Sequence, residues 1–502
     1  MTRLNQPRKT TIWLAPLAAL LLAAAPVELP SLEKQLATAA ALVDEGKSAE
    51  ALAILDPLLA TTEFPLEKGQ IEGLRSFALA RANRIPEARK AIEASVASNP
   101  APTMLLLRQL FLLRAFTGDP KAAGETLLLI AASDPKGLNT LPTEIVTDVL
   151  RAAHTGKTAA DKDRAFELDY AMVTAGWAPA DATLADLDWL RLRLATSLAD
   201  RDRLDDARPV IAQMLNPVVL VRLGIDRRFA SLWPEIEKRL GPGADIADAA
   251  YVGAAKERFD KKPDSLIARL GYAEALNIAS REPEAMVVAD VVKTPEELAK
   301  LTDREIWLVN LHAELLGDAG KTDAAMARLA ALNATPISTR PGMVGTVISE
   351  VLLAQSLGRY KETLQLADAA EAKLTGASDY GRLYLAHART CALAGLGRKD
   401  EAAKAAAPLI DKPEANDDSY LAAMICLGRM DAAAAAIIRR LGEPDDRAAM
   451  LFNMQPFLIN DRPNGRDITY RAGMRALKAR ADVKAAYLKA GRDLPAAVAP
   501  PR

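Results

Sequence analysis

The chain has 502 residues, with 64 Lys and Arg against 65 Asp and Glu, so its formal net charge is −1. Because 50% of the residues are hydrophobic and about one fifth are alanine, the composition excludes an intrinsically disordered chain. A pI of about 6.4 argues against binding of polyanions through overall charge, and two cysteines exclude a scaffold held by several disulfides.

Residues 1–25 have the pattern of a secretory signal peptide. Arg3, Arg8 and Lys9 precede an apolar run from Ile12 to Ala25 that ends in an Ala-x-Ala pattern. A membrane-spanning helix needs about 20 apolar residues, so we predict cleavage after Ala25, with retention as an inner-membrane anchor as the alternative. No cysteine follows the run as a lipid attachment point. Together with the alanine-rich composition, the pattern predicts a bacterial protein exported to the periplasm.

The chain after the signal peptide is predicted to be helical almost throughout. Strong helix formers dominate it, and apolar residues recur at helical spacing, as at Leu52, Leu55 and Leu59. Gly, Asn, Asp or Pro interrupts this pattern at short intervals. The sequence therefore predicts short helices joined by tight turns.

One motif recurs along these helices: a turn residue, often Gly, is followed five positions later by a small residue that opens the next helix. Alanine is so common that this pair alone is weak, but a second small residue often lies seven positions before the turn. Small residues let two antiparallel helices approach closely, and Gly readily adopts the positive φ that ends the first helix. The pairs of turn and small residue are Gly46/Ala51, Asn83/Ala88, Gly118/Ala123, Asp202/Ala207, Ser280/Ala285, Gly320/Ala325, Gly358/Thr363, Gly397/Ala402 and Gly428/Ala433. The residues seven positions before these turns are Ala39, Ser76, Phe111, Ala195, Ala273, Ala313, Val351, Thr390 and Leu421.

This combination resembles the tetratricopeptide repeat (TPR), in which such residues and a closing Pro recur with a period of about 34 residues. The resemblance implies an all-α fold, a right-handed α-solenoid of antiparallel helix pairs whose concave face binds peptides or partner domains. The spacing of the motif varies, and segments 136–186 and 218–265 show helices but no clear repeat. We therefore expect a degenerate, TPR-like superhelix.

Gly and Pro mark two breaks in the predicted solenoid, at 240–244 and at 338–342, and each is either a hinge or a longer loop. The break at 240–244 divides the chain into two predicted halves, and a Pro/Ala-rich end is predicted to be disordered. The expected segments are a signal peptide at 1–25, solenoid halves at 26–240 and 244–444, basic capping helices at 445–492, and a disordered tail at 493–502.

Residues with catalytic or ligand chemistry are scattered. His154, His312 and His387 lie in no metal-binding motif, and no phosphate-binding loop or nucleophile elbow occurs. Acidic pairs such as Asp417 and Asp418 lie at helix starts, where a carboxylate offsets the helix dipole. We therefore predict no catalytic residue, no metal site and no cofactor, and the sequence identifies no binding residue.

The two cysteines, Cys391 and Cys426, lie on the first helices of adjacent predicted pairs. A disulfide is allowed in an oxidising periplasm. Neighbouring helix axes lie about 9 Å apart, however, and a disulfide needs Cα atoms within about 7 Å. Two buried free thiols are the favoured interpretation, with a disulfide as the alternative.

Residues 466–492 carry eight basic and two acidic residues together with an apolar stripe. A terminal capping helix, packed on one face, is the favoured interpretation. The alternative is a patch for an acidic partner or for anionic lipid headgroups. The stripe consists of Met474, Leu477, Val483, Tyr487 and Leu488.

The predicted function is a non-enzymatic periplasmic scaffold that binds protein partners, and not nucleic acid, on its concave face. The resemblance implies roles in envelope assembly, polysaccharide export or protease recruitment. The alternative is a helical-superhelix enzyme acting on peptidoglycan or glycans, as in soluble lytic transglycosylases. The catalytic Glu-Ser pair of that family is missing from Leu441 onward, where Glu443 is the only glutamate. A deep pocket with two unpaired carboxylates would favour the enzyme.

Overall fold

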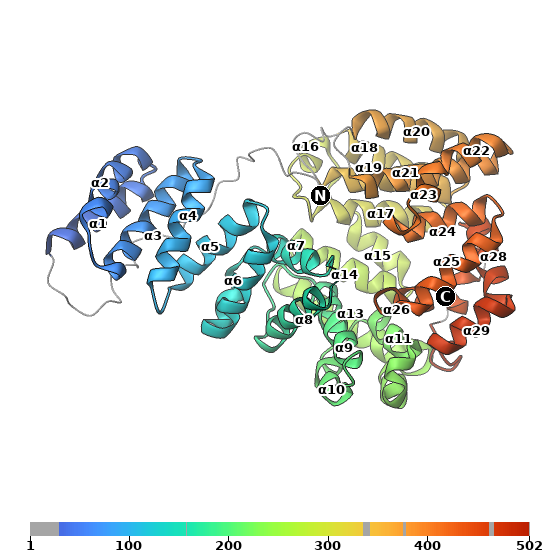
Figure 1. Ribbon diagram of the computed structural model, residues 1–502. Helices are drawn as coiled ribbons and strands as arrows, with labels where there is room; N and C mark the ends of the chain where they lie inside the picture. Colours follow the sequence, from blue (N-terminus) through green and yellow to red (C-terminus); the bar gives the residue numbers. More distant parts are fainter. Residues whose placement is uncertain (1–29, 157, 335–341, 375–377, 461–465, 501–502) are drawn as a thin grey trace. The chain divides into compact units, whose positions relative to one another are not determined.

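The computed structural model describes residues 30–500 except 157, 335–341, 375–377 and 461–465. The predicted signal peptide and most of the predicted break at 338–342 lie outside the described residues. Among those residues every regular secondary-structure element is a helix. The one β-type pairing is an isolated bridge between Asp226 and Gly491. The predicted all-α class is confirmed. The chain forms two compact units, Met1–Ala180 and Asp181–Arg502 (Figure 1).

The first unit is built from consecutive antiparallel helices whose buried faces form one hydrophobic core around Leu55, Ile71, Phe77 and Ile92. Its helices are α1 (Pro30–Asp44), α2 (Ser48–Thr61), α3 (Pro65–Arg81), α4 (Ile85–Ser98), α5 (Met104–Phe116), α6 (Pro120–Ser133), the short 3₁₀ helix η2 (Pro135–Thr140), α7 (Thr143–Ala153) and α8 (Ala159–Thr174).

The second unit continues the same arrangement over a longer stretch of chain. Its helices are α9 (Leu184–Ala199), α10 (Leu204–Ala212), α11 (Pro217–Ile225), η3 (Arg227–Leu232), α12 (Trp233–Leu240), η4 (Pro242–Ala244), α13 (Asp245–Lys261), α14 (Leu266–Ile278), α15 (Glu282–Ala289), α16 (Pro295–Leu298), α17 (Ile306–Asp318), α18 (Thr322–Asn333), α19 (Met343–Ser356), α20 (Tyr360–Lys373), α21 (Asp379–Gly395), α22 (Lys399–Ala405), α23 (Ala407–Asp411), η6 (Pro413–Ala415), α24 (Asp417–Cys426), α25 (Met430–Gly442), α26 (Pro444–Asn453), α27 (Pro456–Ile459), α28 (Ile468–Ala479) and α29 (Ala481–Ala490).

The predicted turn motif is present in all nine pairs. Every turn residue has a positive φ, from +55° at Ser280 to +79° at Gly46. Every small residue five positions later is fully buried, and the residues seven positions before the turns are buried as well. At Gly397 the turn is closed by the Arg398 N–H, which donates to the Leu393 carbonyl at 2.9 Å. The fold is therefore an α-solenoid of TPR-like helix pairs with the predicted register.

Two segments without the motif are helical but irregular, as expected. Segment 136–186 holds η2, α7 and α8, and 218–265 holds most of α11 together with η3, α12, η4 and α13. Gly176, which follows α8, has a φ of +70° and is a turn of the same kind. The sequence did not reveal it because the residue five positions later is Asp181 rather than a small apolar residue.

The predicted boundary at 240–244 differs from the structure, in which the two compact units divide at 180/181. Gly241 and Gly243 do adopt positive φ angles of 74° and 58°. The turn they form lies inside the second unit, because α12 packs against α13 and the Gly243 N–H donates to the Ala497 carbonyl at 2.9 Å.

The prediction of a disordered tail at 493–502 is wrong for residues 493–500. The Leu494 side chain is only 5% exposed, and its N–H donates to Gln455 Oε1 at 2.9 Å. The Tyr487 hydroxyl donates to Asp493 Oδ1 at 2.7 Å. One apolar side chain and its polar neighbours therefore anchor a segment whose composition alone indicates disorder.

The second unit closes on itself, because residues near its C-terminus bind helices near its start. The Arg492 N–H donates to the Ile225 carbonyl at 3.0 Å, and its guanidinium donates to the Gly224 carbonyl at 2.9 Å. The same guanidinium stacks 3.7 Å from the centre of the Trp233 ring and pairs with Glu237. In Figure 1, α26 accordingly lies beside α11, against which it packs. Residues 491–498, called the clasp below, therefore join the two ends of this superhelix.

Candidate functional site

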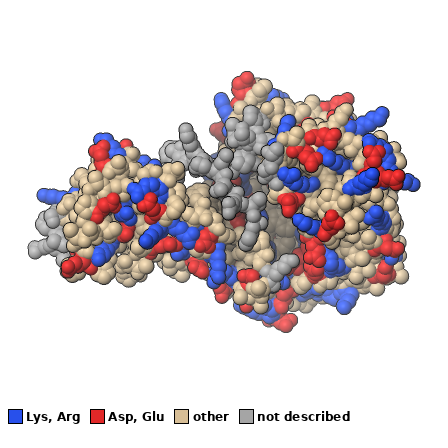
Figure 2. All heavy atoms as spheres, turned by 45° about the horizontal axis from the view of Figure 1, so that its top comes forward, with Lys and Arg blue, Asp and Glu red and all other residues tan. Residues whose placement is uncertain are grey.

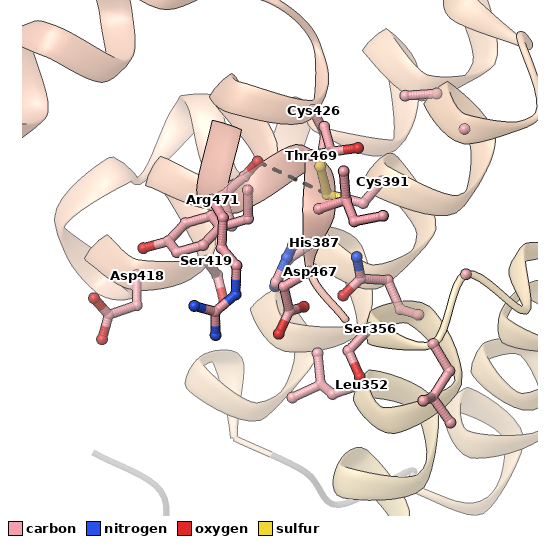
Figure 3. A pocket seen from close by; sticks show the side chains of 18 of the residues that line it. Leu352, Ser356, His387, Cys391, Asp418, Ser419, Cys426, Asp467, Thr469 and Arg471 are labelled. Atoms are coloured by element: carbon pink, nitrogen blue, oxygen red, sulfur yellow. Dashed lines mark hydrogen bonds between the residues drawn. A yellow bond between two sulfur atoms is a disulfide. The ribbon is translucent and has the colours of Figure 1, made fainter. Parts of the chain in front are cut away.

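A cavity of about 690 Å³ lies in the second unit between three successive first helices, α19, α21 and α24, and the C-terminal segment around α28 (Figure 3). The first-helix residues that line it recur mostly at 13, 10, 6, 3 and 2 positions before each turn residue. We call the surface made by these positions the inner face. From α19, α21 and α24 it contributes Leu352, Gln355, Ser356, Tyr384, His387, Cys391, Ala394, Gly395, Asp418, Ala422 and Cys426.

Helix α28 crosses this inner face and forms another wall of the cavity, together with Asn453 of α26 and Leu458 and Ile459 of α27. At its start, the Asp467 N–H donates to the Ser356 carbonyl at 3.1 Å, and Arg466 Nε donates to Ser356 Oγ at 3.1 Å. Farther along, Gly473 lies so close to Ile425 of α24 that a Cβ there would collide with the Ile425 side chain. The chain thus covers part of its own inner face.

Asp418 lines the cavity at the start of α24, and its side chain is 60% exposed. It accepts a hydrogen bond from Arg440 Nη1 at 2.8 Å, and Figure 3 shows it beside the cavity with Arg471 and His387. Burial lowers the pKa of His387 to about 4, against a smaller opposing effect of Asp418. Burial, reinforced by Asp418, raises the pKa of Tyr470. At neutral pH both of these side chains are therefore uncharged.

Asp418 also influences the pKa of Arg222, which lies in α11 near the start of the second unit. The Arg222 guanidinium of α11 lies 4.5 Å from the centre of the Trp189 ring and 5.1 Å from that of Phe452. Burial lowers its pKa to about 10, and Asp418 partly opposes this shift. Asp418 of α24 thus acts electrostatically on a buried guanidinium of α11.

The three histidines do not come together. His154 caps α7 and lies 2.9 Å from the buried carboxylate of Asp169, whereas His312 is buried in α17 and His387 faces the cavity. Within the described ranges, no three His, Cys, Asp or Glu side chains form a group that could hold a metal ion.

Cys391 and Cys426 form a disulfide between α21 and α24, so the favoured interpretation of two free thiols is wrong. Their Cα atoms are 5.1 Å apart. The axis-to-axis estimate fails because Cα atoms lie about 2.3 Å from the helix axis. Two cysteines on facing sides of neighbouring helices therefore approach well within bonding range.

The arrangement does not meet the condition set for a glycan-cleaving enzyme. Asp418 and Asp467 are the carboxylates among the cavity's lining residues, and Asp418 is already paired with Arg440. The Ser419 hydroxyl is buried, and among the described residues it bonds neither to His387 nor to any other group. A serine nucleophile needs a hydrogen-bonded base, and Ser419 has none among the described residues.

Acidic pairs lie in first helical turns, as predicted. Asp417 and Asp418 begin α24, where the Asn416 side chain accepts a hydrogen bond from the Ser419 N–H as the N-cap. Asp417 also pairs with Arg439. The sequence explained these acids locally but gave no sign that Asp418 faces a cavity.

The basic segment 466–492 packs as a cap in the structure. Met474, Leu477, Val483 and Tyr487 are at most 2% exposed, while Leu488 is 49% exposed. Six of the eight basic side chains bond to acids or carbonyls of the chain, namely Arg466, Arg471, Arg475, Lys478, Arg480 and Arg492. Figure 2 shows Lys and Arg interspersed with Asp and Glu over the face of the molecule in view. These contacts favour the cap over the docking patch.

Comparison with known proteins gives structural similarity without sequence similarity. No protein-family model matches the chain, and no curated protein sequence matches it. The C-terminal part of a TPR repeat-containing protein from Cytophaga hutchinsonii is 14% identical, over 61% of this chain and 98% of that one, with a TM-score of 0.26. The Naa15/Naa10 complex bound to HypK-THB is 15% identical over 91% and 83% of the two chains (TM-score 0.24), and the APC/C hetero-tetramer Cut9-Hcn1 is 13% identical over 91% and 90% (TM-score 0.29). The repeat assignment rests on the turns and buried small residues of this chain itself.

No helix among the described residues is long and apolar enough to cross a membrane.

Proposed function

We propose that this protein is a non-enzymatic scaffold of the bacterial periplasm that binds a protein partner through the inner face of its helix pairs. The observation that carries the proposal is the repeated register, in which equivalent positions of successive first helices line one surface. Repeat proteins use such continuous surfaces to bind partners.

Export is supported by two features. Residues 1–25 have the cationic start, short apolar run and small-residue exit of a signal peptide. The disulfide between Cys391 and Cys426 is of a kind that persists in oxidising compartments. The proposal is tested by sequencing the N-terminus of the protein recovered from the cell envelope, which should begin at or near Pro26. An intact Met1 would contradict cleavage and indicate the membrane-anchored alternative.

The first unit offers the inner face for a partner, since α28 covers part of this face in the second unit. Phe116 lies two positions before the turn at Gly118, the position that Ser356 and Cys426 occupy in the cavity. Its side chain is 47% exposed. An exposed aromatic ring at this register is the anchor that a bound peptide would use.

A photo-crosslinking amino acid at position 116 tests this assignment in cells. The matched control is position 129 in the second helix α6, where Leu129 is 41% exposed. We expect a specific crosslinked product from position 116 and none from 129, and mass spectrometry of that product would distinguish envelope assembly, polysaccharide export and protease recruitment. Equal crosslinking at both positions, or none at 116, would contradict binding through the inner face.

A further inference from the structure

We propose that the cavity between α19, α21, α24 and α28 is a binding site for a neutral hydroxylated ring compound, a mono- or disaccharide. This site is separate from the partner-binding inner face of the first unit, so either proposal can fail without the other.

The dimensions of the cavity favour a small ligand. Its volume of about 690 Å³ lies within the range of roughly 300–1,000 Å³ that is typical of small-molecule sites. The hydrogen bond between the Asp467 N–H and the Ser356 carbonyl spans the inner face on one side, and the close contact of Gly473 with Ile425 spans it on the other. An extended peptide lying along the inner face would have to displace α28, whereas a sugar would not.

The charged side chains that line the cavity have partners within the protein. Asp418 is paired with Arg440, Asp467 also has an interaction partner in the chain, and the neighbouring Arg466 is paired with Asp318 at 2.8 Å. The Arg471 guanidinium donates to the carbonyls of Leu458 and Asn460. His387 is neutral at physiological pH because burial lowers its pKa to about 4. An ionic ligand would therefore lose its hydration shell without gaining an unpaired countercharge.

Polar groups without partners, next to aromatic rings, set the chemistry of the ligand. Among the described residues of the lining, His387 Nδ1 and Ser419 Oγ are buried without a hydrogen-bond partner, and Tyr470 adds a hydroxyl to the same lining. Tyr360 and Tyr384 add aromatic surface to the lining. A sugar fits both features, because its hydroxyls exchange hydrogen bonds with neutral donors and acceptors while its C–H face packs on a ring. A purely apolar ligand would leave the His387 and Ser419 polar groups buried without partners.

Isothermal titration calorimetry with the full chain tests the site, with glucose, N-acetylglucosamine and N,N′-diacetylchitobiose as probes. We expect the wild type to bind at least one of them. Tyr470→Phe removes a single hydroxyl and should weaken that binding about fivefold or more. The matched control is Tyr170→Phe in the first unit, which should leave the affinity unchanged; Tyr170 is 40% exposed.

Leu352→Trp, which fills the cavity, provides a second variant and should abolish binding, while circular dichroism verifies that each variant is folded. The proposal is overturned if the wild type binds none of the three sugars. It is equally overturned if Tyr470→Phe binds as tightly as the wild type and the Tyr170→Phe control. It is also overturned if phosphate or spermidine competes for the site, since that would show recognition of charge.

Discussion

A single residue in the left-handed region ends the first helix of each predicted pair. At Gly397 the φ angle is +76°, and no heavy atom lies within 4 Å of the place a Cβ would occupy. A side chain there meets no steric obstacle beyond its own backbone. Gly397→Val should therefore destabilise the protein by about 1–3 kcal/mol through backbone strain alone. Urea unfolding followed by circular dichroism measures the change.

Gly253 is the matched control for this substitution. It also has open space around its Cβ position, but it lies in the middle of α13 and its φ is not positive. Gly253→Ala should stabilise the protein by about 0.5–1 kcal/mol, because Ala loses less conformational entropy in a helix. An unchanged stability for Gly397→Val would show that the turn assignment is wrong, and a loss for Gly253→Ala would contradict the helical placement of the control.

Glu274 makes stability depend on pH in a defined direction. Burial, assisted by the nearby Asp186 carboxylate and opposed by Arg304, raises its pKa to about 7 from the usual 4.5. A raised carboxyl pKa means that the folded state binds the proton more tightly, so stability falls as pH rises from about 4.5 to 7. Glu274→Gln removes this dependence and should raise the free energy of unfolding at pH 8 by about 1–3 kcal/mol relative to wild type.

The same variant at pH 4 provides the internal control, since the wild-type carboxyl is then protonated in both the folded and the unfolded chain. The two proteins should unfold at nearly the same urea concentration there. A Glu274→Gln variant that is less stable than the wild type at pH 8 would contradict the raised pKa of a buried Glu274 carboxyl.

Turn residues could be predicted from the sequence because the contacts that define them are local. Asn83, Asp202 and Ser280 were recognised without glycine, from small residues five positions after and seven before them. His387 and Asp418 could not be recognised as site residues. They are 31 positions apart, and only the packing of α21 against α24 brings them to one cavity.

At the scale of helices, pairs were predictable and the placement of α28 was not. Residues within one pair lie close in sequence, so their spacing carries the signal. Helix α28 is anchored through Arg466 to Ser356 and Asp318, which lie 110 and 148 positions earlier in the chain. The apolar stripe of this segment indicated a packed helix, but no local pattern could name the surface it packs on.

The disulfide fastens neighbouring first helices at the cavity wall. It closes a loop with a sequence separation of 35 residues, which contains α22, α23 and most of α24. Replacing both Cys391 and Cys426 by Ala should lower the free energy of unfolding by about 2–4 kcal/mol. Thermal unfolding of the oxidised protein and the double variant measures the difference.

Dithiothreitol gives the control for this substitution. It should destabilise the wild type towards the double variant and leave the variant itself unaffected. Equal stability of the wild type with and without reductant would contradict a disulfide that constrains this region.

At the scale of the whole second unit, the clasp changes the architecture that the repeats alone imply. The sequence predicted a solenoid with a disordered tail, because helix pairs repeat and the end is rich in Pro and Ala. The tail instead connects α11 and α12 to α26 and α29. These contacts join residues about 260 positions apart in the sequence. The spacing of residue types cannot predict contacts at such a separation.

Truncation after Ala490 tests what the clasp contributes. It removes the Arg492 contacts with Gly224, Trp233 and Glu237 and exposes the surface that Leu494 covers. Burial of a leucine is worth about 1.5–3 kcal/mol, and each lost hydrogen bond adds about 0.5–1.5 kcal/mol. We expect the second unit to lose at least about 3 kcal/mol in urea unfolding and to expose amides of α11 and α12 to faster hydrogen exchange. Truncation after Val498 keeps these contacts and should behave as the full chain does. If the Ala490 truncation matched the Val498 truncation in both measurements, the helix pairs alone would hold the second unit closed.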